Sequence, residues 1–260
     1  MESQGVMTRE NEVRAKLYKS KIPAWLDYLQ SGTGVVLALF MWGHMLFVST
    51  ILLGKEAMYT VTKFFEGQYI FGESYPAIVM VITGIIFFLF ILHAILAMRK
   101  FPSNYRQYKL FTSHMVRMQH SDTTLWYYQA VTGFIMLFLG SVHLYVIMTH
   151  PGDIGPYASS DRMVSDWMAP LYLILLIAVE VHGSIGLYRL AIKWGWFEGK
   201  NSKISRKRLK KAKYIVTVFF ITLGLATWVM YVKIGIEHKD KAGERYIPES
   251  VIAMQSEGHE

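Results

Sequence analysis

The sequence contains no cysteine among its 260 residues. Disulfides, cysteine-ligated zinc, iron–sulfur clusters held by this chain and thiol nucleophiles are therefore excluded, and any metal must be bound by histidine or carboxylate side chains. The chain is also poor in charge, since 18% of its residues are charged whereas 53% are hydrophobic. This composition is typical of a membrane protein.

Five apolar runs are long enough to cross a membrane, because a hydrocarbon core of about 30 Å requires about 20 helical residues. The predicted spans are residues 25–53, 77–98, 125–148, 171–190 and 214–232. The polar N-terminal region lacks the pattern of a cleaved signal peptide. We therefore expect an all-α membrane protein, residues 1–260 forming a single domain of five transmembrane helices.

Basic residues are distributed unequally between the connections. They are dense in residues 9–21, 99–117 and 193–213, whereas the first connection has only Lys55 and Lys63 and the third only Arg162. This asymmetry predicts a cytoplasmic N-terminus, cytoplasmic second and fourth connections, and a short C-terminal tail outside. The net charge of +8 is then explained by membrane orientation, and no nucleic-acid partner is expected.

Each of the first four predicted spans contains one histidine: His44, His93, His143 and His182. Ionisable residues inside membranes are rare and usually functional. With a rise of about 1.5 Å per residue, His93 and His182 lie roughly 10 Å from the inner ends of their helices, and His44 and His143 roughly 25 to 28 Å from those ends. The depths predict two layers, His93 with His182 and His44 with His143.

Two opposed imidazoles are what a six-coordinate haem requires, and bis-histidine ligation favours electron transfer. A zinc or iron site is the rival interpretation, but it would need three or four ligands at one depth. Gly34 and Gly133, ten residues before His44 and His143, are expected either to admit the edge of a macrocycle or to mediate helix contacts. The other histidines, 114, 120, 150, 238 and 259, are expected to be exposed or interfacial.

Over roughly residues 20–235 the chain resembles the dihaem cytochrome b subunit of succinate:quinone oxidoreductases, most closely the menaquinol:fumarate reductase type. The resemblance is carried by GHMLFVSTILL around His44, HAILAMRKFPSNYRQY from His93, FLGSVHLY around His143 and VEVHGSIGLYRLAIKWGWF around His182. It implies a bacterial inner-membrane anchor with two haem b groups in a four-helix bundle, menaquinone chemistry near the outer haem, and flavoprotein and iron–sulfur subunits on the cytoplasmic side. A dimer of the heterotrimer is also compatible with it.

The resemblance also implies roles for individual residues. His93 and His182 would ligate the inner haem, and His44 and His143 the outer one. The matching positions for contacts with the inner haem's propionates are Gln30, Ser31, Trp126 and Lys193. Glu66 matches the acid that the family places near its quinol site and would accept a proton from the quinol.

Two further residues follow from their positions. Arg162, the only basic residue of the third connection, is a candidate partner for an outer haem propionate. Glu180 lies well inside its span, roughly 15 Å from the outer start, and about 200° around the helix from His182. A carboxyl group in hydrocarbon is expected to be neutral and hydrogen-bonded. We expect Glu180 to pass protons inward as electrons pass between the haems, unless it only bonds a neighbouring helix.

Two other functions remain open from the sequence. One is the cytochrome b subunit of a membrane hydrogenase or formate dehydrogenase. The other is a proton channel or transporter without haem, in which the histidines and Glu180 would line a water path.

Overall fold

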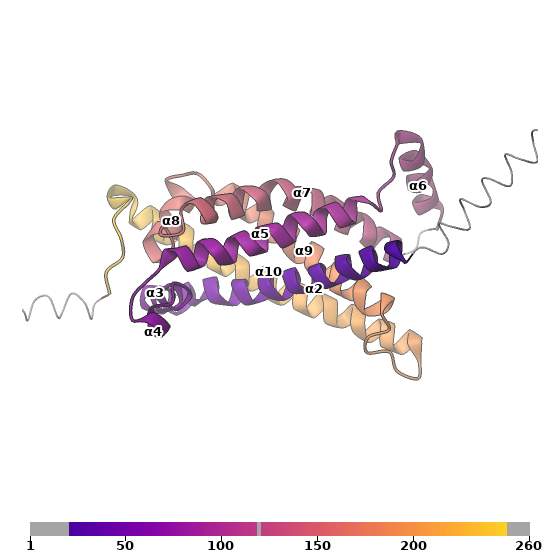
Figure 1. Cartoon of the computed structure of the whole chain (residues 1–260), viewed down its shortest axis with the longest axis horizontal. Helices are drawn as coiled ribbons and strands as arrows, with labels where there is room; N and C mark the ends of the chain where they lie inside the picture. The colour runs from indigo at the N-terminus through magenta and orange to yellow at the C-terminus, as the bar shows by residue number, and fades with distance from the viewer. Residues whose placement is uncertain (1–20, 119–120, 249–260) are drawn as a thin grey trace, which may run out of the picture.

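The computed structural model describes residues 21–118 and 121–248, and these residues contain helices and no strand. Figure 1 shows one elongated bundle of long helices that run side by side. Five of them are long and apolar enough to span a membrane, and the fold class and the number of spans are therefore confirmed. They are α2 (Ile22–Val48), extended by a 3₁₀ turn η1 (Ser49–Leu53), α5 (Pro76–Met98), α7 (Ser121–Thr149), α9 (Ala169–Lys193) and α10 (Ser202–Glu237).

Proline marks where several helices begin. A proline stands in the first turn of α2, α5 and α9, where the first backbone N–H groups have no intrahelical acceptor in any case. Within the apolar runs, helices satisfy every backbone donor and acceptor internally, as hydrocarbon requires. The long helices therefore begin near the predicted span boundaries and follow the runs closely.

The fifth long helix departs most from the prediction. The apolar run predicted residues 214–232, but α10 covers Ser202–Glu237. It begins after Asn201, whose side chain accepts a hydrogen bond from the Ile204 N–H and so caps the helix. Lysine and arginine form helices well, so the basic stretch continues the helix beyond the part that is apolar enough for a membrane.

The connections between the spans contain shorter helices, which hydropathy alone did not predict. They are α3 (Lys55–Phe65), α4 (Gln68–Phe71), α6 (Tyr105–Met118) and α8 (Pro156–Val164). In Figure 1, α3, α4 and α8 lie at the left-hand end of the bundle and α6 at the right-hand end. We call the left-hand end the α8 end, and the other the basic end, after its cations Arg99, Lys100, Lys193, Arg206 and Lys210.

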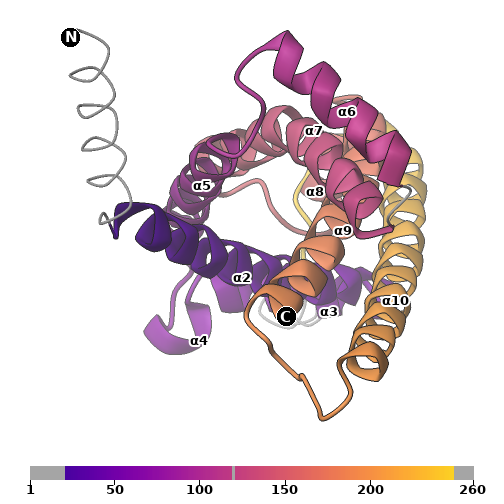
Figure 2. The ribbon, with the colours of Figure 1, turned by 90° about the vertical axis from the view of Figure 1, so that its right-hand side faces the viewer.

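Neighbouring long helices form the walls of the bundle. α7 packs between α5 and α9, α2 packs on α5 and α9, and α10 packs along α9 on the side away from α5. Seen from the basic end in Figure 2, α2, α5, α7 and α9 surround a central space, with α10 outside α9. The four helices that carry the histidines therefore enclose the interior, and the fifth covers one side.

Candidate functional site

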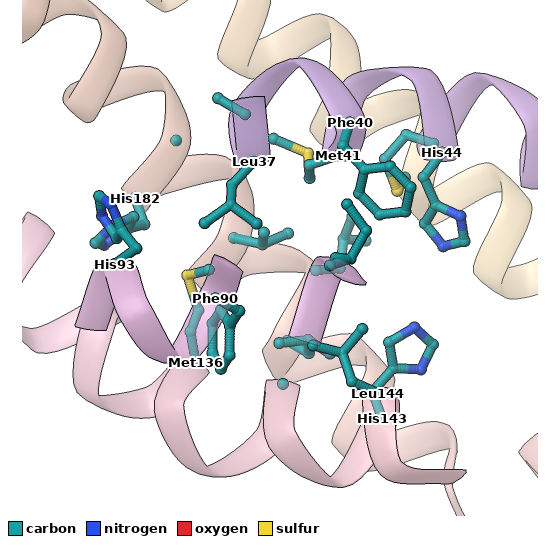
Figure 3. A pocket seen from close by; sticks show the side chains of 18 of the residues that line it. Leu37, Phe40, Met41, His44, Phe90, His93, Met136, His143, Leu144 and His182 are labelled. Carbon is teal, nitrogen blue, oxygen red and sulfur yellow. The ribbon is translucent and has the colours of Figure 1, made fainter. Parts of the chain in front are cut away.

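One elongated cavity of about 1030 Å³ runs through the bundle. Its size is at the upper limit of ordinary small-molecule pockets, which measure about 300–1,000 Å³. All four intramembrane histidines line it: His44, His93, His143 and His182. Figure 3 shows His93 and His182 together at one side and His44 and His143 at the other, with apolar side chains such as Leu37 and Phe90 between.

The histidines face each other in the two pairs that their depths predict. The ring centres of His93 and His182, the first pair, are 6.4 Å apart, and those of His44 and His143, the second pair, are 6.2 Å apart. Metal–imidazole bonds of about 2.0–2.1 Å on both sides of an iron, plus about 1.1 Å from each nitrogen to its ring centre, require about 6.3 Å. The separation within each pair therefore fits one metal that would be held between two imidazoles.

The first pair is also held in the correct tautomer. His182 Nδ1 lies 2.8 Å from the Gln129 carbonyl oxygen of α7, which only accepts, so Nδ1 donates. His93 Nδ1 lies 3.1 Å from Thr33 Oγ1 of α2, whose own proton is donated to the Leu29 carbonyl at 2.8 Å. With Nδ1 protonated, Nε2 of each ring keeps its lone pair for a metal.

Two glycines make room for these rings. A Cβ at Gly34 of α2 would lie 3.0 Å from His93 Cε1, and one at Gly133 of α7 would lie 3.0 Å from His182 Cε1. Both positions therefore allow a close contact between neighbouring helices, one of the two roles considered for them from the sequence. The glycine of one helix accommodates the imidazole of the next.

The second pair has different surroundings. The ring of Tyr172 stands edge-on to His143 at 5.3 Å, and His143 Nδ1 is buried without a hydrogen bond to the described residues. Arg162 of α8 is buried, lines the cavity and interacts with the Tyr172 hydroxyl. Its guanidinium also donates to the Asp153 carbonyl. The structure thus places one buried cation near this pair.

The four residues expected to contact propionates all line the cavity near its basic end: Gln30, Ser31, Trp126 and Lys193. Gln30 Oε1 is buried without a hydrogen-bond partner among the described residues. Ser31 accepts a hydrogen bond from the Trp194 indole at 3.1 Å. These groups could hold carboxylates that enter from the cavity.

Asp27 was missed by the sequence analysis. Its carboxylate pairs with Arg99 at 2.7 Å, Lys100 at 2.8 Å and Lys193 at 3.1 Å. Lys100 lines the cavity with Lys193. The only signal in the sequence was an acid near the end of a span, and its three partners come from other helices and their ends.

Glu66 ends α3 and is 2% exposed. Its carboxylate accepts a hydrogen bond from Lys63 Nζ at 2.6 Å. Glu66 itself does not line the cavity, whereas its neighbours Thr62 and Phe65 do. The sequence analysis used Lys63 only for orientation, although it is the direct partner of Glu66.

Glu180 is completely buried in α9, and neither of its carboxyl oxygens makes a hydrogen bond with the described residues. It does not line the cavity, although Val179 and His182 do. Glu180 thus faces away from the histidine pairs, as its helical position predicts. The Trp42 indole of α2 interacts with the Glu180 carboxyl group, although the two do not meet strict hydrogen-bond geometry.

The remaining predictions on metal ligands have mixed outcomes. Within residues 21–118 and 121–248, no group of three or more histidine, aspartate or glutamate residues could hold a metal ion, which weakens the zinc interpretation. His114 and His150 are exposed as predicted. His238, at the end of α10, is buried and not exposed, because the chain after α10 folds back over it. His120 and His259 lie outside the described residues.

Comparison with known proteins gives consistent matches. Residues 104–226 match the family described as succinate dehydrogenase/fumarate reductase transmembrane subunit. The chain is 55% identical over 240 residues to the fumarate reductase cytochrome b subunit of Wolinella succinogenes, covering 92% of this chain and 94% of that protein. It is 54% identical over 224 residues to the subunit of the same name from Helicobacter pylori strain J99, covering 86% of each.

Proposed function

The chain belongs to the family of fumarate reductase cytochrome b subunits, and on this premise we propose that it binds two haem b groups in one membrane-spanning bundle. A cytochrome b subunit binds haem, and haem supplies one-electron transfer. In our proposal His93 and His182 ligate one haem, and His44 and His143 the other. The observation that carries the proposal is the pair of ring-centre distances, 6.4 and 6.2 Å, inside one continuous cavity.

Family membership also decides between the functions that the sequence left open. It makes the chain a membrane subunit of a fumarate reductase complex, so the hydrogenase, formate dehydrogenase and transporter interpretations are no longer needed. Membership in the complex implies flavoprotein and iron–sulfur partners. We propose that these partners bind the basic end and that this end faces the cytoplasm, because cytoplasmic segments of membrane proteins are rich in lysine and arginine.

The polar residues at the two ends of the cavity would orient the haems. Gln30, Ser31, Trp126 and Lys193 would hold propionates of the haem at the first pair, since they line the basic end of the cavity. Arg162 would neutralise a propionate at the second pair, where it is buried beside Tyr172. Buried carboxylates need such cations or donors to offset their desolvation.

We propose that menaquinol is the electron donor and reacts near the α8 end. Quinol oxidation releases protons, so the site needs a base. Glu66 would accept one, because it is a buried carboxylate one residue from the cavity-lining Phe65. Lys63, whose Nζ lies 2.6 Å from the Glu66 carboxylate, would hold that carboxylate in place beside the cavity.

Glu180 would carry protons across the middle of the bundle. Electrons that pass from the α8 end to the basic end move charge across the membrane, at about 2.3 kcal/mol per charge for each 100 mV. Protons that move the same way cancel this charge. Glu180 is suited to the task because it is fully buried, lacks a hydrogen bond to the described residues and lies outside the haem cavity.

The first experiment is a haem count. The purified complex should contain two haem b groups per copy of this chain by pyridine haemochrome assay. His93→Ala and His182→Ala should each remove the same haem, and His44→Ala and His143→Ala the other, as resolved by redox titration. One haem per chain, or a loss pattern that couples His93 to His44, would refute the assignment.

A further inference from the structure

The chain after α10 folds back onto α8 and onto the connection before it. Residues 238–245 include the short turn η2 (Lys239–Lys241) and make hydrogen bonds to Gly152, Asp153 and Asp161. In Figure 1 the yellow end of the ribbon lies beside α8 at the left-hand end of the bundle. We call residues 238–245 the C-terminal clamp.

The clamp begins where α10 and α8 touch. A Cβ at Gly235 of α10 would lie 2.5 Å from the Ser160 carbonyl oxygen, so the two backbones can approach this closely only because position 235 is glycine. Ser160 is completely buried by the contact. His238 lies three residues after Gly235, on the same face of the helix, and therefore falls opposite Asp161, the residue after Ser160.

Asp161 is the centre of the clamp. Its Oδ1 accepts a hydrogen bond from His238 Nδ1 at 2.9 Å, and its Oδ2 accepts one from the Gly243 N–H at 3.0 Å. The His238 ring is buried and stacks on Tyr157 of α8, with ring centres 4.0 Å apart and an angle of 13°. Gly243 has a φ of +94°, a conformation that favours glycine. One carboxylate thus ties α8 to both ends of the turn.

Arg245 completes the clamp. It donates to the Gly152 carbonyl at 2.8 Å and to Asp153 Oδ1 at 2.9 Å. The backbone carbonyl of the same Asp153 accepts the hydrogen bond from Arg162. Arg162 follows Asp161 directly in α8 and lines the cavity at the second histidine pair. The clamp therefore makes hydrogen bonds to Asp161, the residue before Arg162, and to Asp153, the residue whose carbonyl Arg162 binds.

We propose that the C-terminal clamp positions Arg162 at the second histidine pair, with His238 and Asp161 as positioning residues that do not touch the haem. This inference rests on the role proposed above for Arg162. Its physical basis is that the interaction energy of two charges depends on the distance between them. This dependence is steeper in a buried site than in water, because the dielectric constant is lower there. A guanidinium held near a haem favours the reduced, more electron-rich state, so its displacement should lower the reduction potential of that haem.

The test is redox titration of the haem spectra in the purified complex. Arg162→Gln should lower the potential of the haem at the second pair and leave the other unchanged. His238→Gln should shift the same haem in the same direction by a smaller amount. His238→Asn should retain the wild-type potential, because the asparagine amide nitrogen stands at the same number of bonds from the backbone as Nδ1 and can donate to Asp161, whereas the glutamine amide nitrogen lies one bond further out.

A double variant separates positioning through Arg162 from a direct effect of the Asp161 carboxylate. If the clamp acts through Arg162, His238→Gln adds no further shift in an Arg162→Gln background. An additive shift, or an equal shift of both haems, overturns the proposal. If Arg162→Gln shifts the potential and His238→Gln does not, only the clamp is refuted. If Arg162→Gln has no effect, the role of Arg162 fails and the clamp with it.

A milder variant covers the case in which His238→Gln does not assemble. Arg245 is exposed, and Arg245→Gln removes its bonds to Gly152 and Asp153 without opening the core. It should lower the potential at the second pair, and an unchanged potential would contradict the proposal. Lys239→Gln, which alters an exposed residue of the same segment, is the matched control and should have no effect.

Discussion

The imidazoles of His93 and His182 each have one nitrogen committed to a neighbouring helix. Their Nδ1 atoms donate to Thr33 Oγ1 and to the Gln129 carbonyl, and Nε2 remains for a metal. The second pair has no such bond at His143 Nδ1 within the described residues. Both pairs consist of histidines. They differ because neighbouring helices provide an acceptor for Nδ1 of both rings in the first pair, whereas the described residues provide none for His143 Nδ1.

Glu180 allows a test at the same scale. Glu180→Gln replaces a group that can carry a proton by one of the same shape that cannot, at a position outside the haem cavity. We expect menaquinol:fumarate turnover to be lost while both haem spectra and both potentials stay as in the wild type. Activity assays and redox titration of the same preparation provide the measurement.

Glu66→Gln is the comparison for that variant. It should also abolish turnover, but at an earlier step, so that a menaquinol analogue no longer reduces the haems. In Glu180→Gln a single reduction of the haems by the analogue should persist. Full turnover in Glu180→Gln would show that the carboxyl group of Glu180 takes no part in proton transfer and has only a structural role.

At the scale of elements, the contact of one helix with the next sets the position of the first pair. Gly133→Ala would place a Cβ 3.0 Å from His182 Cε1, tighter than ordinary contacts allow, and the ring would have to move. Rigid helices cannot easily separate, because interiors are close-packed. We expect Gly133→Ala to weaken or abolish haem binding at the first pair and to spare the second, as measured by haem content and redox titration.

Gly32→Ala is the control for this prediction. Gly32 lies on α2 with nothing within 4 Å of an added Cβ. Alanine there should leave both haems in place and stabilise the helix by about 1 kcal/mol through helix propensity alone. If Gly133→Ala also binds two haems with unchanged potentials, the close contact is not a constraint on the site.

The connections show a second effect at this scale. The apolar runs predicted the spans, but α3, α4, α6 and α8 lie in the connections, for which hydropathy predicted no helix. α8 matters most, because it carries Arg162 to the cavity and Asp161 to the C-terminal clamp. The sequence indicated Arg162 as a charged residue of a short connection, but it did not predict α8, the helix that brings Arg162 to the cavity.

At the scale of the whole molecule, the question is whether turnover moves net charge across the membrane. Two uncompensated electrons moving towards a negative interior would cost about 4.6 kcal/mol at 100 mV. If protons accompany them through Glu180, this cost vanishes. We therefore expect menaquinol:fumarate turnover by the complex in sealed vesicles to be unchanged when an uncoupler collapses the membrane potential.

The readout for this prediction is the rate with and without uncoupler, together with a potential-sensitive dye. Vesicles made without the complex give the dye baseline. A clear acceleration by uncoupler, or a potential generated during turnover, would mean that the electrons cross without compensating protons.

The amino-acid sequence was enough to predict the fold class, the number of spans, the four intramembrane histidines and their grouping by depth. These follow from local properties: hydropathy summed over about 20 residues, and a fixed rise per residue along a helix. The structure shows the same two histidine pairs, because the position of a residue along a straight helix of known direction fixes its depth in the membrane.

Three-dimensional packing was needed to show which nitrogen of His93 and His182 is free and that Asp27 pairs with three cations. It was also needed to show that the ion pair of Glu66 with Lys63 lies inside the protein and that the buried His238 binds Asp161. Lys63 and Glu66 are only three residues apart, and for them the tertiary structure decides the burial of the pair. The other contacts join residues from different helices and connections, and they depend on the rotation of each helix about its axis and on its neighbours. That rotation is set by packing across the bundle, and no local pattern in the chain encodes it.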